Sequence, residues 1–197
     1  MLKQTRRRNR GLKKTLPEAL QAMQQDHGEV AVWTTDEHRL GLKPILKRLW
    51  APHGQRPTIT IYPRYEWLYL YAFVQPATGA SQYFIMPRLN RDVFAIALAQ
   101  FAATTDKHIL LVMDNAAWHR SSKLPVPDNV TLLFQPPYSP EVQPAEHLWQ
   151  LTDAPLTNIC PDNLDCLEAL LSDQCAWLQQ HPELIKSTTK FHWWPDI

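Results

Sequence analysis

The stretch LLVMDNAAWHRSSKLPVPDNVTLLFQPPYSPEVQPAEHLWQ, residues 110–150, decides the fold because it sets two apolar runs beside two isolated acids. The first run, His108–Met113, is rich in branched residues and stops at Asp114 and Asn115, as a buried strand does when it meets a polar cleft. The second run, Val130–Phe134, ends at a proline-rich loop. We therefore expect two strands, each followed by polar residues.

The loop after the second run is stiffened by proline and leads to an acidic residue. Its prolines fix their own φ angles and disfavour helical geometry before them, so the backbone has little conformational freedom up to Ala145. Glu146 then opens a helical segment, AEHLWQLTD. Glu141 lies in the same loop and is a rival candidate, although it sits in a turn rather than on a helix. The loop prolines are Pro136, Pro137, Pro140 and Pro144, and the residues of the helix expected to face the core are Leu148, Trp149 and Leu151.

A further acid, Asp36, ends the strand-like run Glu29–Thr34 near the start of the chain. Glu37 competes with it, but adjacent strand residues point to opposite faces, so only one of the pair should reach a shared site. Three carboxylates that meet in space can bind two Mg²⁺ or Mn²⁺ ions, which are hard cations that prefer oxygen ligands. Two such ions would stabilise the attacking and leaving oxygens of an in-line phosphoryl transfer.

Three segments in combination resemble the DDE transposases of the mariner superfamily, in particular its bacterial insertion-sequence branch. They are WTTDEHRLGLKP (33–44), DNAAWH (114–119) and PPYSPEVQPAEHLW (136–149). The resemblance covers about residues 15–195 and implies that Asp36, Asp114 and Glu146 are the catalytic metal ligands, with two Mg²⁺ or Mn²⁺ ions as cofactors. Two features depart from the family pattern: Gln143 stands where asparagine is usual before the proline, and the family's N-terminal helix-turn-helix region is absent.

The resemblance also implies a fold and an activity. The fold would be a ribonuclease H-like α/β domain over residues 15–197, with a mixed sheet of about five strands flanked by helices. The chain would hydrolyse a phosphodiester at the end of an insertion sequence, and the freed 3′ hydroxyl would then attack a phosphodiester of target DNA at the same site. The implied partners are double-stranded DNA, a second copy of the chain and an upstream-encoded helix-turn-helix portion. Asn115 and His119 would support the ligands or contact the scissile phosphate.

The order of the other elements agrees with such a fold. Expected strands cover Thr58–Tyr62, Trp67–Val74 and Gln82–Met86, with a turn signal at Pro76–Gly79 between the last two. The middle strand is apolar on both faces, which predicts a central strand covered by helices. Asn90 is the expected N-cap of a helix over Arg91–Thr104. A right-handed crossover through that helix would bring Asp36 and Asp114 together.

Basic residues are concentrated in two places. Residues 1–14 hold seven of the twenty lysines and arginines and no acid, although the whole chain has a net charge of only +1. We expect this arm to lack regular structure and to contact phosphates or act as a linker, the alternative being a solubilising tail. A second basic stretch follows Asp36, where the alternative is a solvated loop. The residues assigned to DNA are Arg6, Arg7, Arg8 and Arg10 in the arm, and Lys43, Lys47, Arg48 and Arg56 in the second stretch.

Several local patterns lie outside these motifs. Thr15 is the expected N-cap of a short helix to Gln25. The segment Asp162–Ile185 has the spacing of one amphipathic helix, and the aromatic tail His192–Pro195 should dock on the body or on a second subunit. The spacing of the cysteines matches no zinc motif, so we expect reduced, buried thiols. The cysteines are Cys160, Cys166 and Cys175.

Composition favours one globular domain. The hydrophobic content of 45% and charged content of 20% are ordinary, and no apolar run approaches the length of a membrane span. Without a signal peptide, the expected compartment is the cytoplasm. Two other functions stay open: an inactive transposase fragment that binds DNA or mixes with intact subunits as a regulator, and another ribonuclease H-like nuclease such as a junction resolvase. The second accounts for the acids but not for the PPYSPEVQPAEHLW arm.

Overall fold

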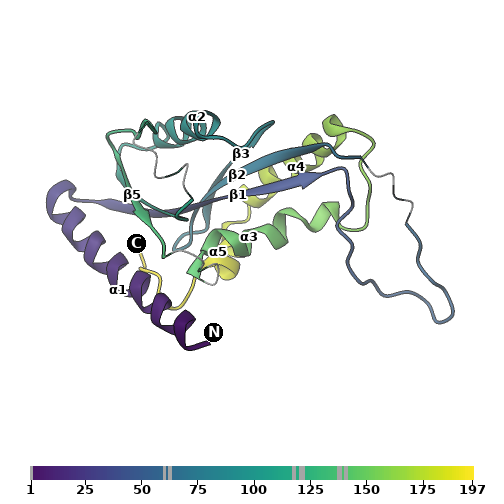
Figure 1. Ribbon diagram of the computed structural model, residues 1–197, viewed down its shortest axis with the longest axis horizontal. Coiled ribbons are helices and arrows are strands. Elements are labelled where there is room, and N and C mark those ends of the chain that lie inside the picture. Colours follow the sequence, from purple (N-terminus) through teal and green to yellow (C-terminus); the bar gives the residue numbers. More distant parts are fainter. Residues whose placement is uncertain are drawn as a thin grey trace.

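A single mixed sheet forms the centre of the protein (Figure 1). The computed structural model describes residues 2–59, 61, 64–116, 119, 123–136, 139 and 142–197, with the backbone alone over 2–10. The sheet order is β3-β2-β1-β4-β5; β1, β2 and β3 pair antiparallel, whereas β4 pairs parallel with β1 and with β5. The strands are β1 (Val30–Gly41), β2 (Trp67–Gln75), β3 (Ala80–Met86), β4 (His108–Met113) and β5 (Val130–Phe134).

Helices cover both faces of this sheet. One face carries α2 (Arg91–Ala102), and Phe94 and Phe101 of this helix pack on Phe73 of β2. The other face carries α1 (Leu2–His27), α3 (Pro144–Thr152), the 3-10 turn η2 (Ala154–Leu156), α4 (Leu164–Gln179) and α5 (Pro182–Thr189). β2 therefore buries both of its faces, as its uninterrupted apolar pattern predicts.

The predicted strands β4 and β5 have the bounds that their apolar runs indicate. Asn90 caps α2, because its side chain accepts a hydrogen bond from the backbone N–H of Val93. The aromatic tail docks on the body, as expected: Trp194 is buried in the cluster under α1, and Lys13 lies over the ring of Trp193 at 5.5 Å. Within the described part of the chain, no helix combines the length and the apolar character that crossing a membrane requires.

The first helix is longer than the sequence pattern indicates. α1 begins at Leu2, so the expected helix start at Thr15 and the expected lack of regular structure over 2–14 are wrong. Thr15 lies inside the helix and donates its hydroxyl to the carbonyl of Gly11. The reason is an apolar stripe that packs on the β1–β4 part of the sheet and stabilises a helix otherwise rich in charge. The stripe consists of Leu12, Leu16, Leu20 and Met23.

Other local predictions also need correction. The expected single helix over 162–185 is two helices, because Pro182 lacks an N–H and begins α5. No strand forms at residues 58, 59 and 61, while Thr60 and Tyr62 lie outside the described residues. All three cysteines are free thiols; Cys175 is buried, but Cys166 is exposed, contrary to expectation.

Candidate active site

The parallel pairing of β1 and β4 places two of the three expected acids at the same level of the sheet. Thr34 pairs with Val112, and Asp36 and Asp114 each follow two residues later. β4 ends at Met113, whereas β1 continues to Gly41 against β2. The expectation that β1 ends before Asp36 is therefore wrong. Because β1 loses its β4 neighbour at this level, Asp36 lies on a strand edge that opens beside Asp114.

Asp36 is enclosed by α3. Trp149 donates its indole N–H to Asp36 Oδ2 at 3.1 Å. Burial, and then the charges of Glu37 and Glu146, raise the pKa of Asp36 to about 7. Glu146 is itself exposed on the first turn of α3, three residues before Trp149, so both side chains lie on one side of the helix. The structure thus brings Asp36 within the electrostatic influence of the third expected acid.

Asp114 is held by groups on its own side of the sheet. Its Oδ1 accepts hydrogen bonds from His119 Nδ1 at 2.6 Å and from the backbone N–H of Ala116 at 3.1 Å. The bond from His119 lowers the pKa of Asp114, and half of the side chain remains exposed. The carboxylate is therefore ionised and accessible.

His119 connects Asp114 to Glu37. The other ring nitrogen, Nε2, lies 3.1 Å from Glu37 Oε1, and both side chains are buried. Burial alone would lower the pKa of His119, but the bonds to Asp114 and Glu37 and their charges raise it to about 9. Burial raises the pKa of Glu37. At neutral pH both ring nitrogens of His119 therefore carry protons, and they donate to Asp114 and to Glu37.

A buried glutamine fastens the start of α3 to the sheet. Gln143 Oε1 accepts from the Thr34 hydroxyl at 2.6 Å and from Gln135 Nε2 at 2.6 Å, and its Nε2 donates to the Thr35 carbonyl at 2.9 Å. Gln143 thereby joins β1, the residue after β5, and the helix that carries Glu146. Gln143, which stands where the family usually has asparagine, thus has a structural role that the sequence analysis did not predict.

Replacing Gln143 with leucine should lower the free energy of unfolding by about 2–3 kcal/mol, because buried donors and an acceptor lose their partners while the side-chain volume is kept. Urea unfolding of the purified chain measures the loss. Gln150→Leu, an exposed position on the same helix, is the matched control and should change stability by less than about 0.5 kcal/mol. Equal stability of the two variants would contradict the assigned role.

Sequence reasoning missed the role of Trp149, which was expected to face the core. Its ring stacks on His38, with centroids 4.9 Å apart, while its N–H binds Asp36. In turn, His38 Nε2 lies 2.8 Å from Oδ1 of Asp153, the residue that follows α3. The spacing of three residues between Glu146 and Trp149 was the available signal, since it puts both on one helix face.

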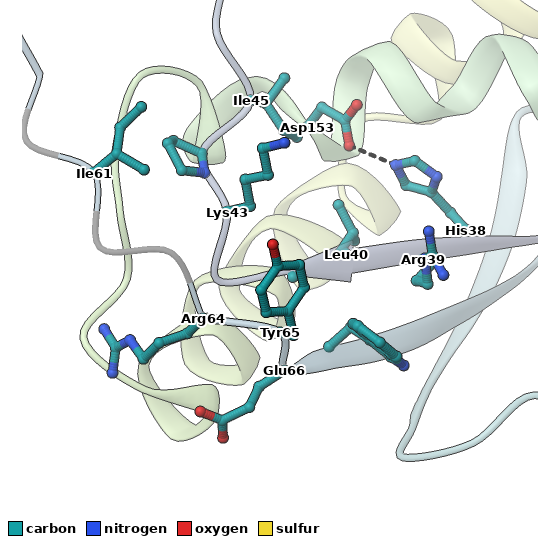
Figure 2. A pocket seen from close by; sticks show the side chains of 13 residues that line it. His38, Arg39, Leu40, Lys43, Ile45, Ile61, Arg64, Tyr65, Glu66 and Asp153 are labelled. Carbon is teal, nitrogen blue, oxygen red and sulfur yellow. Dashed lines mark hydrogen bonds and ion pairs between the residues drawn. The ribbon is translucent and has the colours of Figure 1, made fainter.

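A pocket of about 510 Å³ lies beyond Asp36 along β1, between the end of α3 and the segment that precedes β2 (Figure 2). The His38–Asp153 pair forms one wall, and Trp67, with the Arg39 guanidinium 5.1 Å from its ring centroid, contributes to another. Lys43, one of the residues assigned to DNA, also lines the pocket. The site therefore continues into a surface that combines aromatic and basic side chains.

The remaining expected residues have different outcomes. Asn115 Oδ1 is buried and, within the described part of the chain, has no hydrogen-bond partner. Lys43, Lys47, Arg48 and Arg56 are all exposed in residues 43–56, which follow β1 and extend away from the sheet (Figure 1). The side chains of Arg6, Arg7, Arg8 and Arg10, and the whole of Glu141, lie outside the described residues.

The three expected ligands are not gathered into one ready coordination sphere. Among the described residues, no group of three or more histidines, cysteines, aspartates or glutamates is arranged to hold a metal ion. The charges of Glu37 and Glu146 act on Asp36, while Asp114 is bonded to His119 and through it to Glu37. Both Asp36 and Asp114 lie two residues beyond the last β1–β4 pair, at the same edge of the sheet.

Replacing Asp36 with asparagine should stabilise the metal-free protein above pH 7. The pKa of Asp36 rises from 3.8 to about 7 on folding, so its ionisation destabilises the fold fully above pH 7 and not at all below about pH 4. A shift of about three pKa units corresponds to ~4 kcal/mol, and solvent relaxation around the charge reduces the expected gain to about 2 kcal/mol. Asparagine can still accept from Trp149.

Urea unfolding with chelator at pH 8 and at pH 4 tests this. The increase in the free energy of unfolding of Asp36→Asn over wild type should be present at pH 8 and disappear at pH 4. Asp173→Asn, at an exposed position on α4, should show no such difference between the two pH values. An Asp36→Asn variant that is less stable than wild type at pH 8 would contradict the prediction.

Comparison with known proteins gives the family and the fold. The family described as DDE superfamily endonuclease matches residues 31–170. An uncharacterized protein, y4pE/y4sA, of Sinorhizobium fredii (strain NBRC 101917 / NGR234) is 38% identical over 86 residues, which are 43% of this chain and 64% of that protein. This family match spans more than half of the chain, and its range includes Asp36, Asp114 and Glu146.

Solved structures of Mos1 transposase resemble the whole fold. The Mos1 strand transfer complex has a TM-score of 0.58 at 18% identity, covering 95% of this chain and 63% of that one. The mariner Mos1 paired-end complex with Mg has a TM-score of 0.58 at 18% identity, covering 91% and 62%. The chain therefore spans somewhat under two thirds of these relatives. The likeness confirms the expected ribonuclease H-like α/β fold, and with the family match it shows that the protein belongs to the DDE superfamily endonucleases.

Proposed function

We propose that the chain is the catalytic core of a transposase that cleaves DNA at the ends of an insertion sequence and transfers the strand to a target, using divalent metal ions. The observation that carries the proposal is the level placement of Asp36 and Asp114 on neighbouring parallel strands, with the helix of Glu146 fastened to the same strand through Gln143. Family membership supports the chemistry, since the DDE superfamily consists of endonucleases.

The donor set fits hard divalent cations. Asp36, Asp114 and Glu146 offer carboxylate oxygens, which suit Mg²⁺ or Mn²⁺. The charges of Glu37 and Glu146 raise the pKa of Asp36 in addition to burial, so this edge of the sheet holds excess negative charge that a cation would offset. The three acids would hold the metal, expected as two ions, which would neutralise charge on the attacking and leaving oxygens of phosphoryl transfer. Mos1 complexes with Mn and with Mg are known.

The chain's own residues orient the ligands and require no protein nucleophile. His119 and Ala116 occupy one oxygen of Asp114, and Trp149 fixes one oxygen of Asp36. Such prior orientation is the main contribution that a protein can make to phosphoryl transfer, which needs positioning and charge neutralisation more than covalent chemistry. Asn115, whose buried Oδ1 has no hydrogen-bond partner among the described residues, is proposed to support the same region.

The exposed basic residues between β1 and β2 are proposed to hold the DNA backbone, together with the arginines near the start of α1. Lys43, Lys47 and Arg48 follow directly from the strand that carries Asp36, so DNA bound there would reach the acids. A second copy of the chain and a helix-turn-helix portion encoded upstream are proposed partners for recognising the element ends. Mos1 has been solved as a paired-end complex with the left transposon end.

The test uses the DNA that flanks the coding sequence. Duplexes carrying the inverted repeats on either side of the gene are incubated with the purified chain and Mn²⁺ or Mg²⁺, and the products are mapped at nucleotide resolution. We expect metal-dependent cuts at the repeat ends. Cleavage of an RNA·DNA hybrid in preference to duplex DNA would instead indicate a ribonuclease. Binding of DNA with neither Mn²⁺ binding nor cleavage would overturn the proposal in favour of a regulatory role.

A further inference from the structure

Three side chains form a continuous connection from β1 to the residue after β4. Glu37 Oε1 lies 3.1 Å from His119 Nε2, and His119 Nδ1 lies 2.6 Å from Asp114 Oδ1. The exposed fraction of the side chain is 8% for Glu37 and 2% for His119, but 52% for Asp114. The connection therefore begins in the core and ends at the accessible acid.

Glu37 and His119 lie on the α2 face of the sheet, opposite the face on which Trp149 binds Asp36. Adjacent strand residues point to opposite faces, and Glu37 shares its face with Thr35 and Trp33. The ring of His119 lies against Phe94 of α2, with centroids 5.0 Å apart. Glu37 is thus separated by the sheet from Trp149, which binds Asp36. This placement directs the Glu37 carboxylate at His119 and not at the face of Asp36, which gives it a task other than metal binding.

We propose that Glu37 and His119 are positioning residues that fix the carboxylate of Asp114 for metal binding. This inference rests on the proposed function, because it treats Asp114 as a metal ligand. β4 ends at Met113, so Asp114 is not held by pairing within the sheet. His119 and the N–H of Ala116 both donate to Oδ1, which leaves Oδ2 as the oxygen for a cation. The side chain is thereby committed to one orientation before any metal arrives.

Glu37 is needed because His119 alone cannot hold this arrangement. With Nδ1 directed at Asp114, the second ring nitrogen, Nε2, lies in the core, where a polar atom without a hydrogen-bond partner is costly. Glu37 accepts from Nε2 and fixes the ring orientation, so that Nδ1 stays directed at Asp114 Oδ1, in the way that outer carboxylates orient histidines and ligands around metal sites. Removing Glu37 should therefore loosen Asp114, although the two do not touch through a direct hydrogen bond.

The test compares Mn²⁺ affinity by calorimetry across a graded set of variants. Glu37→Met removes the acceptor and His119→Ala removes the connection; each should weaken Mn²⁺ binding about 10- to 100-fold, the range seen for outer-shell residues. Glu37→Gln keeps an acceptor oxygen and should lose less than about threefold. His119→Asn can still donate to Asp114 and should fall between wild type and His119→Ala. The matched control is Phe94→Leu, which loosens the same packing without touching the hydrogen bonds.

A second readout needs no metal. The amide of Ala116 donates to the same oxygen as His119, so its NMR resonance reports how Asp114 is held. It should shift in Glu37→Met and remain in place in Glu37→Gln and Phe94→Leu. Thermal unfolding of each variant is recorded in parallel, because a merely structural role would lower the melting temperature and leave both the Mn²⁺ affinity and this resonance unchanged.

The outcomes separate the two levels of the proposal. In one outcome, wild type binds Mn²⁺ and Asp114→Asn does not, but Glu37→Met and His119→Ala bind Mn²⁺ as tightly as wild type. The positioning role is then overturned, while the proposed function stands. If Glu37→Gln loses as much affinity as Asp114→Asn, Glu37 is itself a ligand and the inference is also overturned. If wild type binds no Mn²⁺ with or without DNA, the proposed function fails, and the inference fails with it.

Discussion

Asp114→Asn is expected to reduce metal-dependent DNA cleavage by this chain at least a thousandfold. The substitution keeps the size of the side chain and leaves an oxygen that can accept from His119 and Ala116, so the local fold should persist. What it removes is the negative charge of a ligand. Metal ions contribute several kcal/mol of charge stabilisation to such transition states, and a loss of about 4 kcal/mol corresponds to a thousandfold in rate.

The measurement is single-turnover cleavage of the repeat-end duplex with saturating Mn²⁺, so that weaker DNA binding does not contribute to the loss. Asp128→Asn provides the control, because Asp128 is exposed just before β5, at the opposite end of the β4–β5 pair from Asp114. It should cleave at the wild-type rate. Full metal-dependent cleavage by Asp114→Asn would exclude Asp114 as a ligand and with it the proposed site.

The elements that could be predicted from the sequence are those whose signal is local. β4 and β5 are short apolar runs with sharp polar ends, and the structure places both within the expected bounds. β1 is different, because its second half reads DEHRLG and has no apolar run. That half is a strand because β2, buried on both faces, pairs with it from Asp36 to Gly41. A partner distant in sequence decides the local structure there.

The same distinction holds for the candidate site. That Asp36, Asp114 and Glu146 are acids beside apolar runs is a sequence feature. Their supporting hydrogen bonds are not, because Gln143 and Trp149 reach β1 across more than a hundred residues. Alternation along β1 predicts that Asp36 and Glu37 point to opposite faces, and their side chains do bind different partners, Trp149 and His119. Nothing in the sequence indicates, however, that Glu37 contacts a histidine 82 positions later. That contact depends on the crossover through α2.

Gly79→Ala is expected to destabilise the protein by about 4 kcal/mol, more than any other single substitution considered. Gly79 closes the β2–β3 turn with φ +81°, a left-handed conformation that costs an alanine about 1–2 kcal/mol. Its added Cβ would also lie 1.8 Å from the carbonyl oxygen of Pro182, the first residue of α5. Backbone cannot rotate away as a side chain can, so overpacking adds about 1–3 kcal/mol.

Gly28→Ala separates these two contributions. Gly28 has φ +76° but open space where a Cβ would be, so alanine there should cost only the conformational part, about 1–2 kcal/mol. Urea unfolding gives both values, and equal losses would show that α5 does not press on the turn. If α5 does pack against the turn, it must shift in Gly79→Ala to make room for the added Cβ. Ile185 of α5 would then pack less tightly on Ala145 and Leu148 of α3. Because α3 carries Glu146, faster hydrogen exchange in α3 would show that this distant turn helps to hold the third acid in place.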